Sequence, residues 1–133
     1  MNYMLDTNIV SYLIKQDTAV KKKLVSKPMT SLVISSITEA ELHYGLAKRP
    51  EAKKLHQLVH EFLIRITVLP WNSETAKTYG TLRASINQTG KSLAPLDLLI
   101  AAHALQTKSI LVTNDQAFHQ IKTLKTEDWS KQA

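Results

Sequence analysis

Short apolar runs alternate with segments of helical periodicity along the whole chain, and this alternation restricts the fold more than any other feature. The apolar runs predict strands over residues 2–5, 32–34, 66–69 and 110–112, with a weak fifth near 123–124. The segments between them predict helices over residues 7–15, 17–26, 36–48, 52–65, 73–88, 95–107 and 115–121. Because strands that alternate with helices pair in the same direction, we expect an α/β fold with a mainly parallel sheet of four to five strands.

Several of the expected helices begin at polar residues of the capping type. Asp17 and Ser73 are placed to cap their helices, and Ser36-x-x-Glu39 fits a capping box, in which each side chain bonds the other residue's backbone N–H. The capping box also gives Glu39 a local structural role.

The 133 residues suit one domain, residues 1–133, with no repeat or linker to divide it. The chain has no cysteine, no signal-peptide pattern and no apolar run of the roughly 18 residues that a membrane helix needs. We therefore expect a cytoplasmic protein with no membrane partner. Lys and Arg number 17 against 11 acids, a net charge of +6, which favours nucleic acid, an acidic protein or anionic lipid as a partner.

Two acidic residues directly follow predicted strands. Asp6 lies in "YMLDTNIVSYL" after the first strand, and Asp115 ends "ILVTND" after the fourth. In parallel sheets, functional groups gather outside the carboxyl ends of the strands, where the order of connections reverses. If the two strands are neighbours, these two carboxylates face each other.

Two further acids lie on helices that begin at the same edge. Glu41 follows the capping box without sharing in it, on a face with Ala40 and Gly45 that we expect to point inward. Asp97 lies in "APLDLLIAAHAL", among apolar neighbours. An acid in the first turn of a helix is also favoured by the helix dipole, so Asp97 alone does not establish a site.

Four acids from separate elements at one edge predict a divalent-cation site. Mg²⁺ and Mn²⁺ prefer hard oxygen ligands and relieve the mutual repulsion of clustered carboxylates. Such an ion polarises a phosphate oxygen and lowers the pKa of a bound water. Because any α/β domain presents some acids at this edge by chance, spacing alone also leaves structural roles open.

Four segments in sequence resemble the PIN-domain toxins of bacterial VapBC toxin–antitoxin pairs: "MLDTNIVSYLI", "ISSITEAELHYGLAK", "PLDLLIAAHAL" and "ILVTNDQAF". The resemblance spans essentially the whole chain. It implies a three-layer α/β/α sandwich and a Mg²⁺- or Mn²⁺-dependent endoribonuclease. It also implies a small VapB-like antitoxin as partner, a homodimer, and higher assembly with the antitoxin.

Matched position by position, the family pattern places its catalytic acids at Asp6, Glu41, Asp97 and Asp115. The resemblance implies that the first three hold the metal, directly or through waters. Because some members carry Asn at the fourth position, Asp115 is the less certain ligand and would hold a second metal or orient water. The hypothesis is in-line attack of a metal-activated water on the scissile phosphorus, which leaves a 5′-phosphate and a 3′-hydroxyl.

Other polar residues are candidates for supporting roles. Asn8 and Thr113 are placed to hydrogen-bond the acids, and Arg83 and Lys91 flank the loop that leads to Asp97 and are candidate RNA contacts. We expect Tyr12, Tyr44 and His103 to pack, which are the usual roles of such residues.

Competing functions remain open at this point. An aspartate-nucleophile phosphatase also has an Asp after its first strand, but it needs a second Asp where this chain has Asn8. A zinc pair at His56 and His60 lacks the inner Glu of H-E-x-x-H. A non-catalytic RNA- or protein-binding module is the main alternative. The RNA target is not encoded visibly; enteric relatives of the family suggest transfer RNA, with initiator tRNA as the first guess.

Overall fold

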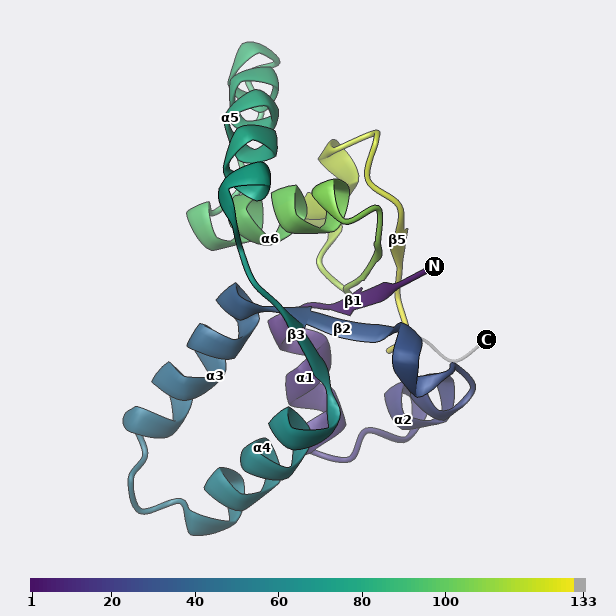
Figure 1. Cartoon of the computed structure of the whole chain (residues 1–133), viewed down its shortest axis with the longest axis vertical. Coiled ribbons are helices and arrows are strands. Elements are labelled where there is room, and N and C mark those ends of the chain that lie inside the picture. Colours follow the sequence, from purple (N-terminus) through teal and green to yellow (C-terminus); the bar gives the residue numbers. More distant parts are fainter. Residues whose placement is uncertain (131–133) are drawn as a thin grey trace.

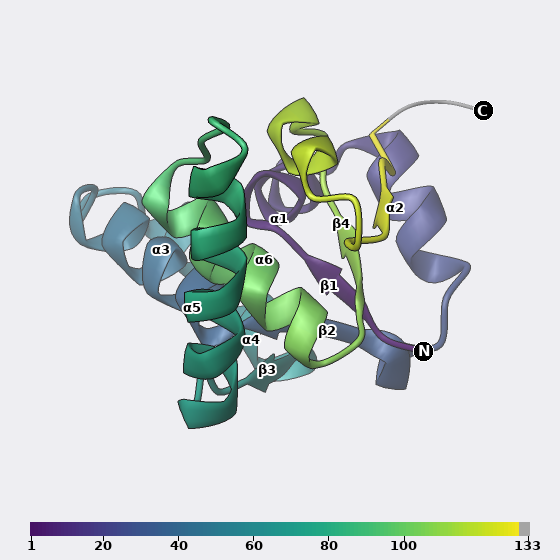
Figure 2. The same ribbon diagram turned by 90° about the horizontal axis from the view of Figure 1, so that it is seen from above.

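The computed structural model describes residues 1–130, and its centre is a five-stranded parallel sheet. The strands are β1 (Tyr3–Leu5), β2 (Leu32–Ser35), β3 (Thr67–Leu69), β4 (Ile110–Val112) and β5 (Thr126–Glu127). Their spatial order is β3-β2-β1-β4-β5, with every neighbouring pair parallel, and Figure 2 shows β1 between β2 and β4. The expected α/β fold is confirmed.

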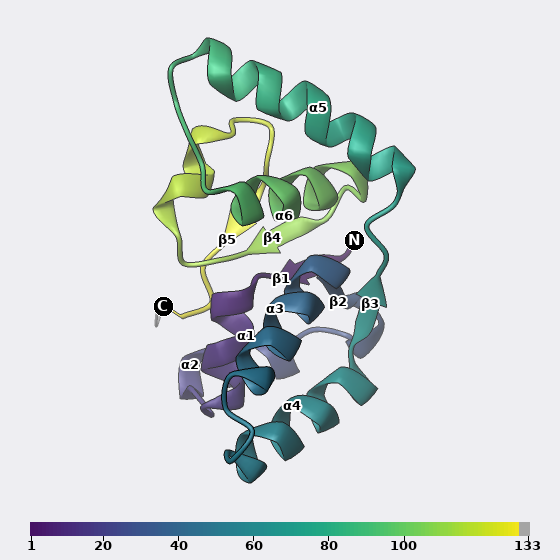
Figure 3. The ribbon, with the colours of Figure 1, turned by 90° about the vertical axis from the view of Figure 1, so that its left-hand side faces the viewer.

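Six α-helices cover the two faces of the sheet. They are α1 (Thr7–Ile14), α2 (Thr18–Val25), α3 (Ser36–Ala47), α4 (Lys53–Arg65), α5 (Ser73–Gln88) and α6 (Pro95–Gln106), with short 3₁₀ helices η1 (Met29–Ser31) and η2 (Gln116–Gln120). In Figures 1 and 3, α5 and α6 lie on one side of the sheet and α1 to α4 on the other. The expected three-layer sandwich is therefore confirmed.

The alternation of side chains along β1 explains the two layers. Met4 points into the core beneath α5 and α6, whereas Leu5 points into the core beneath α1 and α4. Both side chains are fully buried, as a central parallel strand requires. None of the described helices is long and apolar enough to cross a membrane.

The chain order reverses at β1. From β1 the chain builds β2 and β3 to one side, and then returns to add β4 and β5 on the other. The carboxyl ends of β1 and β4 therefore diverge into α1 and η2 at the same edge. This is the position at which open α/β sheets bind ligands.

Three predicted details differ from the structure. The capping box is wrong by one residue: Ser35 caps α3 through a bond from Ile37 N–H, while Ser36 Oγ accepts a bond from Trp71 N–H at 3.1 Å. Likewise Asn72 and not Ser73 caps α5. The fifth strand lies at Thr126–Glu127 and not near 123–124, because pairing with β4 sets its position.

Candidate active site

Asp6 lies at the carboxyl end of β1 and is also the N-cap of α1. Ile9 N–H donates a hydrogen bond to Asp6 Oδ1 at 2.9 Å, and Asp6 N–H donates to the Val112 carbonyl at 3.0 Å. The residue is only 4% exposed. Burial raises the pKa of the Asp6 carboxyl to about 6, and hydrogen bonds from Thr113 and Ile9 limit that rise.

Asp115 and Asp6 are joined through Thr113. Because Leu5 pairs with Val112, the next residues along the two strands, Asp6 and Thr113, lie side by side. The Thr113 side chain hydrogen-bonds the Asp6 carboxylate, and its Oγ1 accepts a bond from Asp115 N–H at 3.0 Å. Asp115 Oδ1 in turn accepts a bond from Ala117 N–H at 2.9 Å, which caps η2.

The two helix-borne acids belong to the same electrostatic neighbourhood. Asp97 is half-buried in the first turn of α6, and its pKa is raised by burial and by the negative charges of Asp115 and Glu41. The charges of Asp97 and Asp115 likewise raise the pKa of Asp6. The structure thus brings Asp97 and Asp115 close enough to Asp6, and Asp115 and Glu41 close enough to Asp97, for their charges to act on these two carboxylates.

Glu41 is held by a residue from the first helix. It is half-buried on α3, and Thr7 Oγ1 donates a hydrogen bond to Glu41 Oε1 at 2.6 Å. Thr7 directly follows Asp6, so the first turn of α1 hydrogen-bonds two acids of the site: Ile9 N–H donates to Asp6, and the Thr7 hydroxyl donates to Glu41. The hydrogen bond from Thr7 offsets part of the free-energy cost of removing the Glu41 carboxylate from water.

The set of oxygen donors suits a hydrated divalent ion. Among residues 1–130, no three acidic or histidine side chains already converge tightly enough to enclose a metal. Mg²⁺ and Mn²⁺ do not need such a cage, because they keep several waters and take one or two carboxylates directly. Burial and neighbouring negative charges raise the pKa values of Asp6 and Asp97, and a nearby cation would favour the charged form of both carboxylates.

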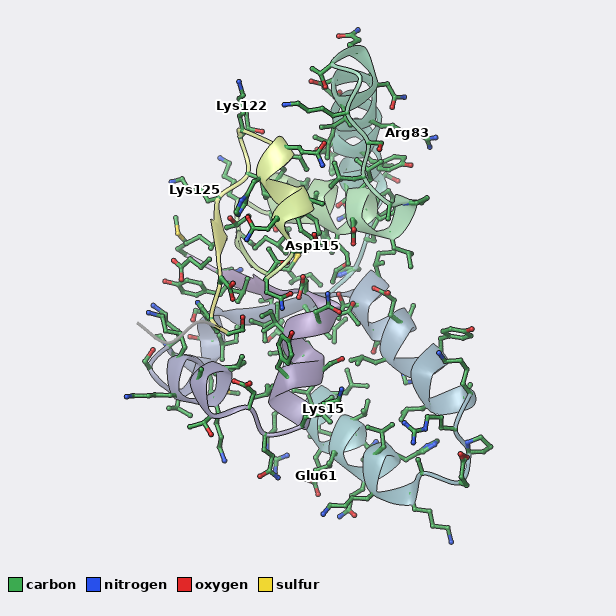
Figure 4. The ribbon with its side chains drawn as sticks, turned by 180° about the vertical axis from the view of Figure 1, so that it is seen from behind. Lys15, Glu61, Arg83, Asp115, Lys122 and Lys125 are labelled. Atoms are coloured by element: carbon green, nitrogen blue, oxygen red, sulfur yellow. The ribbon has the colours of Figure 1, made fainter. Side chains whose placement is uncertain are left out.

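The structure does not bring every predicted residue to this site. Asn8 is exposed on α1, and in the part of the chain that the structure describes no hydrogen bond joins it to an acid. Figure 4 shows Arg83 on α5, pointing away from Asp115. The Arg83 guanidinium donates a hydrogen bond to the Tyr79 hydroxyl at 2.9 Å. Lys91 is exposed in the loop between α5 and α6.

Behind the acids, a buried histidine connects three elements. His103 of α6 is 1% exposed, and its Nδ1 lies 2.7 Å from Ser35 Oγ, while its other nitrogen bonds the Pro70 carbonyl. A carbonyl only accepts, so that nitrogen carries the proton and Nδ1 accepts the Ser35 hydroxyl. Burial lowers the pKa of His103, which keeps the ring neutral. The expected packing role of His103 agrees with this environment.

Two supporting residues of the site are not among those that the sequence predicts. Thr7 adjoins Asp6 and hydrogen-bonds Glu41, and Ser35 takes the capping position predicted for Ser36. Thr7 carried a signal, since a hydroxyl in the first turn of a helix that begins at the acidic edge can reach a neighbouring element. Ser35 carried none, because two adjacent serines at a helix start are equivalent until the helix is placed.

Two tyrosines expected to pack behave differently. Tyr12 is half-buried, and its hydroxyl accepts a bond from Asn114 Nδ2 at 2.8 Å. Tyr44 is 65% exposed, so the prediction that it packs is wrong. It follows Glu41 by three residues, on the outward side of α3.

Comparison with known proteins gives consistent matches. The model of the PIN domain family matches residues 3–124. Ribonuclease VapC2 of Haemophilus influenzae is 35% identical over 130 residues, which cover 97% of this chain and 98% of that protein. The tRNA(fMet)-specific endonuclease VapC of Shigella flexneri is 34% identical over 131 residues, covering 98% and 99% respectively.

Solved structures agree with the sequence matches. A chain of VapBC2 from Rickettsia felis, crystallised bound to a DNA fragment from its promoter, has a TM-score of 0.90 and 34% identity, covering 97% of this chain and 99% of that one. The four sequence segments, the fold and these matches lead to the same conclusion. The chain belongs to the PIN-domain family, among the VapC proteins.

Proposed function

We propose that this chain is a metal-dependent endoribonuclease that works as one PIN domain in the cytoplasm, as the toxin of a toxin–antitoxin pair. The observation that carries the proposal is that Asp6 and Asp115 follow the adjacent parallel strands β1 and β4 at the point where the sheet order reverses. The charges of Asp97 and Asp115 raise the pKa of Asp6, and those of Asp115 and Glu41 raise the pKa of Asp97. The names of the relatives support it, since they describe ribonucleases.

In the proposed reaction, the acids would hold the metal ion and the threonines would position the acids. A bound Mg²⁺ or Mn²⁺ supplies charge stabilisation for the phosphate and a lowered pKa for an attacking water. Asp6, Glu41 and Asp97 offer the carboxylate oxygens for it, and Asp115 offers a further one or orients water. Thr113 and Thr7 hold the carboxylates of Asp6 and Glu41 in place. In-line attack of water forms a new P–O bond and breaks the bond to the 3′-oxygen, which takes a proton from that water.

We propose transfer RNA as the substrate class, with initiator tRNA as the first candidate. Support comes from the Shigella flexneri relative, whose name specifies tRNA(fMet). Cut sites mapped across total RNA after brief induction test this directly. Cleavage confined to initiator tRNA fits the proposal, whereas cuts spread over messenger RNA contradict it.

We also propose a VapB-like antitoxin as partner and a homodimer as the basic assembly. Structures of VapBC complexes from Rickettsia felis, Salmonella typhimurium and Haemophilus influenzae match this chain over nearly its whole length. Co-expression with the candidate antitoxin, followed by purification of a complex and loss of RNA cleavage, is the expected result.

The decisive test of the nuclease compares two aspartates that share one structural role. Asp6 and Asp17 both cap helices, accepting bonds from Ile9 N–H at 2.9 Å and Val20 N–H at 3.0 Å. Asn also caps helices, so Asp6→Asn and Asp17→Asn both preserve the local structure. We expect Asp6→Asn to lose cleavage by a factor of at least about 10³, whereas Asp17→Asn stays within about two-fold of the wild type.

The assay uses the purified full chain, RNA, and Mn²⁺ or Mg²⁺ with and without EDTA. Cleavage that persists in EDTA or in Asp6→Asn would contradict the proposed site. Tight RNA binding with no cleavage under any of these conditions would favour the alternative, a non-catalytic RNA-binding module.

A further inference from the structure

We propose that Lys91 and Lys122 bind the RNA backbone beyond the scissile phosphate, on a basic surface that holds the strand without contacting its bases. The inference rests on the proposed ribonuclease function. The basic surface is formed by two segments that lead to acids of the site, residues 89–94 before α6 and residues 116–122 after Asp115.

Residues 75–126 carry acids only at the proposed site. Their two acids are Asp97 and Asp115. Their six cations are Lys77, Arg83, Lys91, Lys108, Lys122 and Lys125. Residues 1–74, by contrast, hold seven acids, of which only two belong to the site. The part of the chain that contains both segments is therefore positive everywhere outside the acidic site.

A series of hydrogen bonds joins the two segments to each other and to the site. Ala117 N–H donates to Asp115 Oδ1 at 2.9 Å, which fixes the start of η2 at the site. At the other end of η2, Gln120 Nε2 donates to the Ala117 carbonyl at 3.0 Å and to the Ser92 carbonyl at 3.3 Å. The loop before α6 is thereby held against η2, and Figure 3 shows the two side by side.

One lysine extends from each of these segments. Lys91 adjoins Ser92 in the loop before α6, and Lys122 lies two residues beyond the end of η2. Both residues are exposed, and Figure 4 shows Lys122 pointing outward from the protein. Within residues 1–130, neither lysine forms an ion pair with an acid. Both ammonium groups are therefore free to bind an anion.

The order of residues places the lysines next to the acids along the chain. Asp97 comes six residues after Lys91, and Asp115 comes seven residues before Lys122. An RNA strand whose scissile phosphate lies at these acids continues over the surface of the protein. On the side formed by the two segments it meets cations and no further acid.

The chemistry of this surface favours a phosphate backbone as its occupant. Lysine binds phosphate as a point charge, and such contacts carry no sequence information. Residues 89–94 contain no aromatic ring, and Phe118 in the second segment is 1% exposed, so a base has no ring to stack on. Neither segment exposes a large apolar side chain, which the core of a protein interface would use.

The test measures RNA binding without cleavage. Fluorescence anisotropy follows a labelled single-stranded RNA titrated with the full chain in EDTA, at salt concentrations between about 50 and 200 mM. Replacing both Lys91 and Lys122 by Ala should reduce the slope of log K against log salt by about 1.4, since each phosphate contact on a single strand contributes about 0.7. The affinity at about 0.1 M salt should fall by at least about ten-fold.

A second pair of lysines separates position from total charge. Lys53 and Lys54 are also exposed, on α4 at the other side of the sheet. Replacing both by Ala removes the same charge and should leave the RNA affinity within about two-fold of the wild type. Two RNAs of unrelated sequence should lose affinity for the Lys91 and Lys122 double variant by the same factor, because backbone contacts do not depend on the bases.

Three results would overturn the assignment. The first is an RNA affinity and salt slope of the Lys91 and Lys122 double variant equal to those of the wild type or of the control pair. The second is a loss of affinity that differs between the two RNAs. The third is loss of antitoxin binding with RNA affinity unchanged, which would make this surface a contact for an acidic protein.

The same measurements keep the basic surface separate from the nuclease. Because binding is measured in EDTA, RNA binding that depends on Lys91 and Lys122 in a chain that never cleaves RNA would contradict the nuclease alone. Metal-dependent cleavage by a chain whose RNA binding is indifferent to both lysines would contradict the basic surface alone.

Discussion

Asp6 combines two demands that conflict electrostatically. As an N-cap it must accept the Ile9 N–H, which favours the charged carboxylate, yet its burial and the charges of Asp97 and Asp115 disfavour that charge. Burial dominates and raises its pKa from 3.8 to about 6. Burial and neighbouring negative charges do not help an acid to cap a helix, whereas they strengthen its attraction for a bound cation.

The raised pKa makes a prediction for the metal-free protein. Because the folded pKa of Asp6 exceeds its unfolded value, the folded state carries a penalty at pH above about 6, which disappears as the pH falls toward 4. Asp6→Asn removes the charge and keeps the cap. We expect it to raise the free energy of unfolding at pH 8 by about 2 kcal/mol and to have no such advantage near pH 4.

Urea unfolding in EDTA at pH 8 and pH 4 measures this difference. Asp17→Asn serves as the control, because Asp17 also caps a helix but lies outside the acidic site. A variant Asp6→Asn that is less stable than the wild type at both pH values would show that the carboxylate is favourable in the fold.

At the scale of elements, the hydrogen bonds of His103 fix α6 against its neighbours. The imidazole joins α6 to Ser35 at the end of β2 and to Pro70 after β3, and Trp71 Nε1 adds a bond to the Leu99 carbonyl at 2.9 Å. These bonds set the position of α6, which carries Asp97, relative to α3, which carries Glu41. His103 is thus a positioning residue for the acidic site.

Removal of this imidazole should destabilise the fold. His103→Ala leaves the buried Ser35 hydroxyl without its imidazole partner and removes a side chain that is only 1% exposed, so we expect the free energy of unfolding to fall by about 3 kcal/mol. Ser35→Ala should cost about 1 kcal/mol through the lost cap, with part of its effect shared with His103. A double-mutant cycle in urea unfolding should show that shared part, and additive losses would contradict the coupling.

The sequence predicted the elements better than the contacts between them. Asp17 and Pro95 mark helix starts through local chemistry, and their helices begin where expected. The helix α3 also begins at Ser36 as expected, but its cap is Ser35, and Ser36 bonds Trp71, a residue 35 positions away. A partner so distant in the sequence could not be predicted from local chemistry. The same holds for the two-residue strand β5, whose position depends on β4 and not on its own apolar pattern.

The sequence also predicts that Asp6 and Asp115 lie at one edge of the sheet. Asp6 and Asp115 directly follow strands, and the carboxyl ends of neighbouring parallel strands must meet at one edge. The hydrogen bond between Ser35 and His103 could not be predicted, because the two residues lie 68 positions apart along the chain. The position of Thr7 indicates only that its hydroxyl reaches a neighbouring element, and its partner Glu41 is known from the fold.

At the scale of the whole molecule, the charge is divided between a basic chain and an acidic site. The net charge of +6 favours approach to an RNA backbone, while the carboxylates at the reversal point would repel phosphate unless a cation neutralised them. We therefore propose that these acids, distant in sequence, act together on one divalent ion.

Isothermal titration of Mn²⁺ into the metal-free chain measures whether these acids share one ion. We expect the wild type and Asp17→Asn to bind the ion equally, and Asp6→Asn and Asp97→Asn each to lose at least about ten-fold in affinity, since each removes a carboxylate of the same site. Equal Mn²⁺ affinity in the wild type and in Asp97→Asn, or no binding by the wild type, would contradict the shared site.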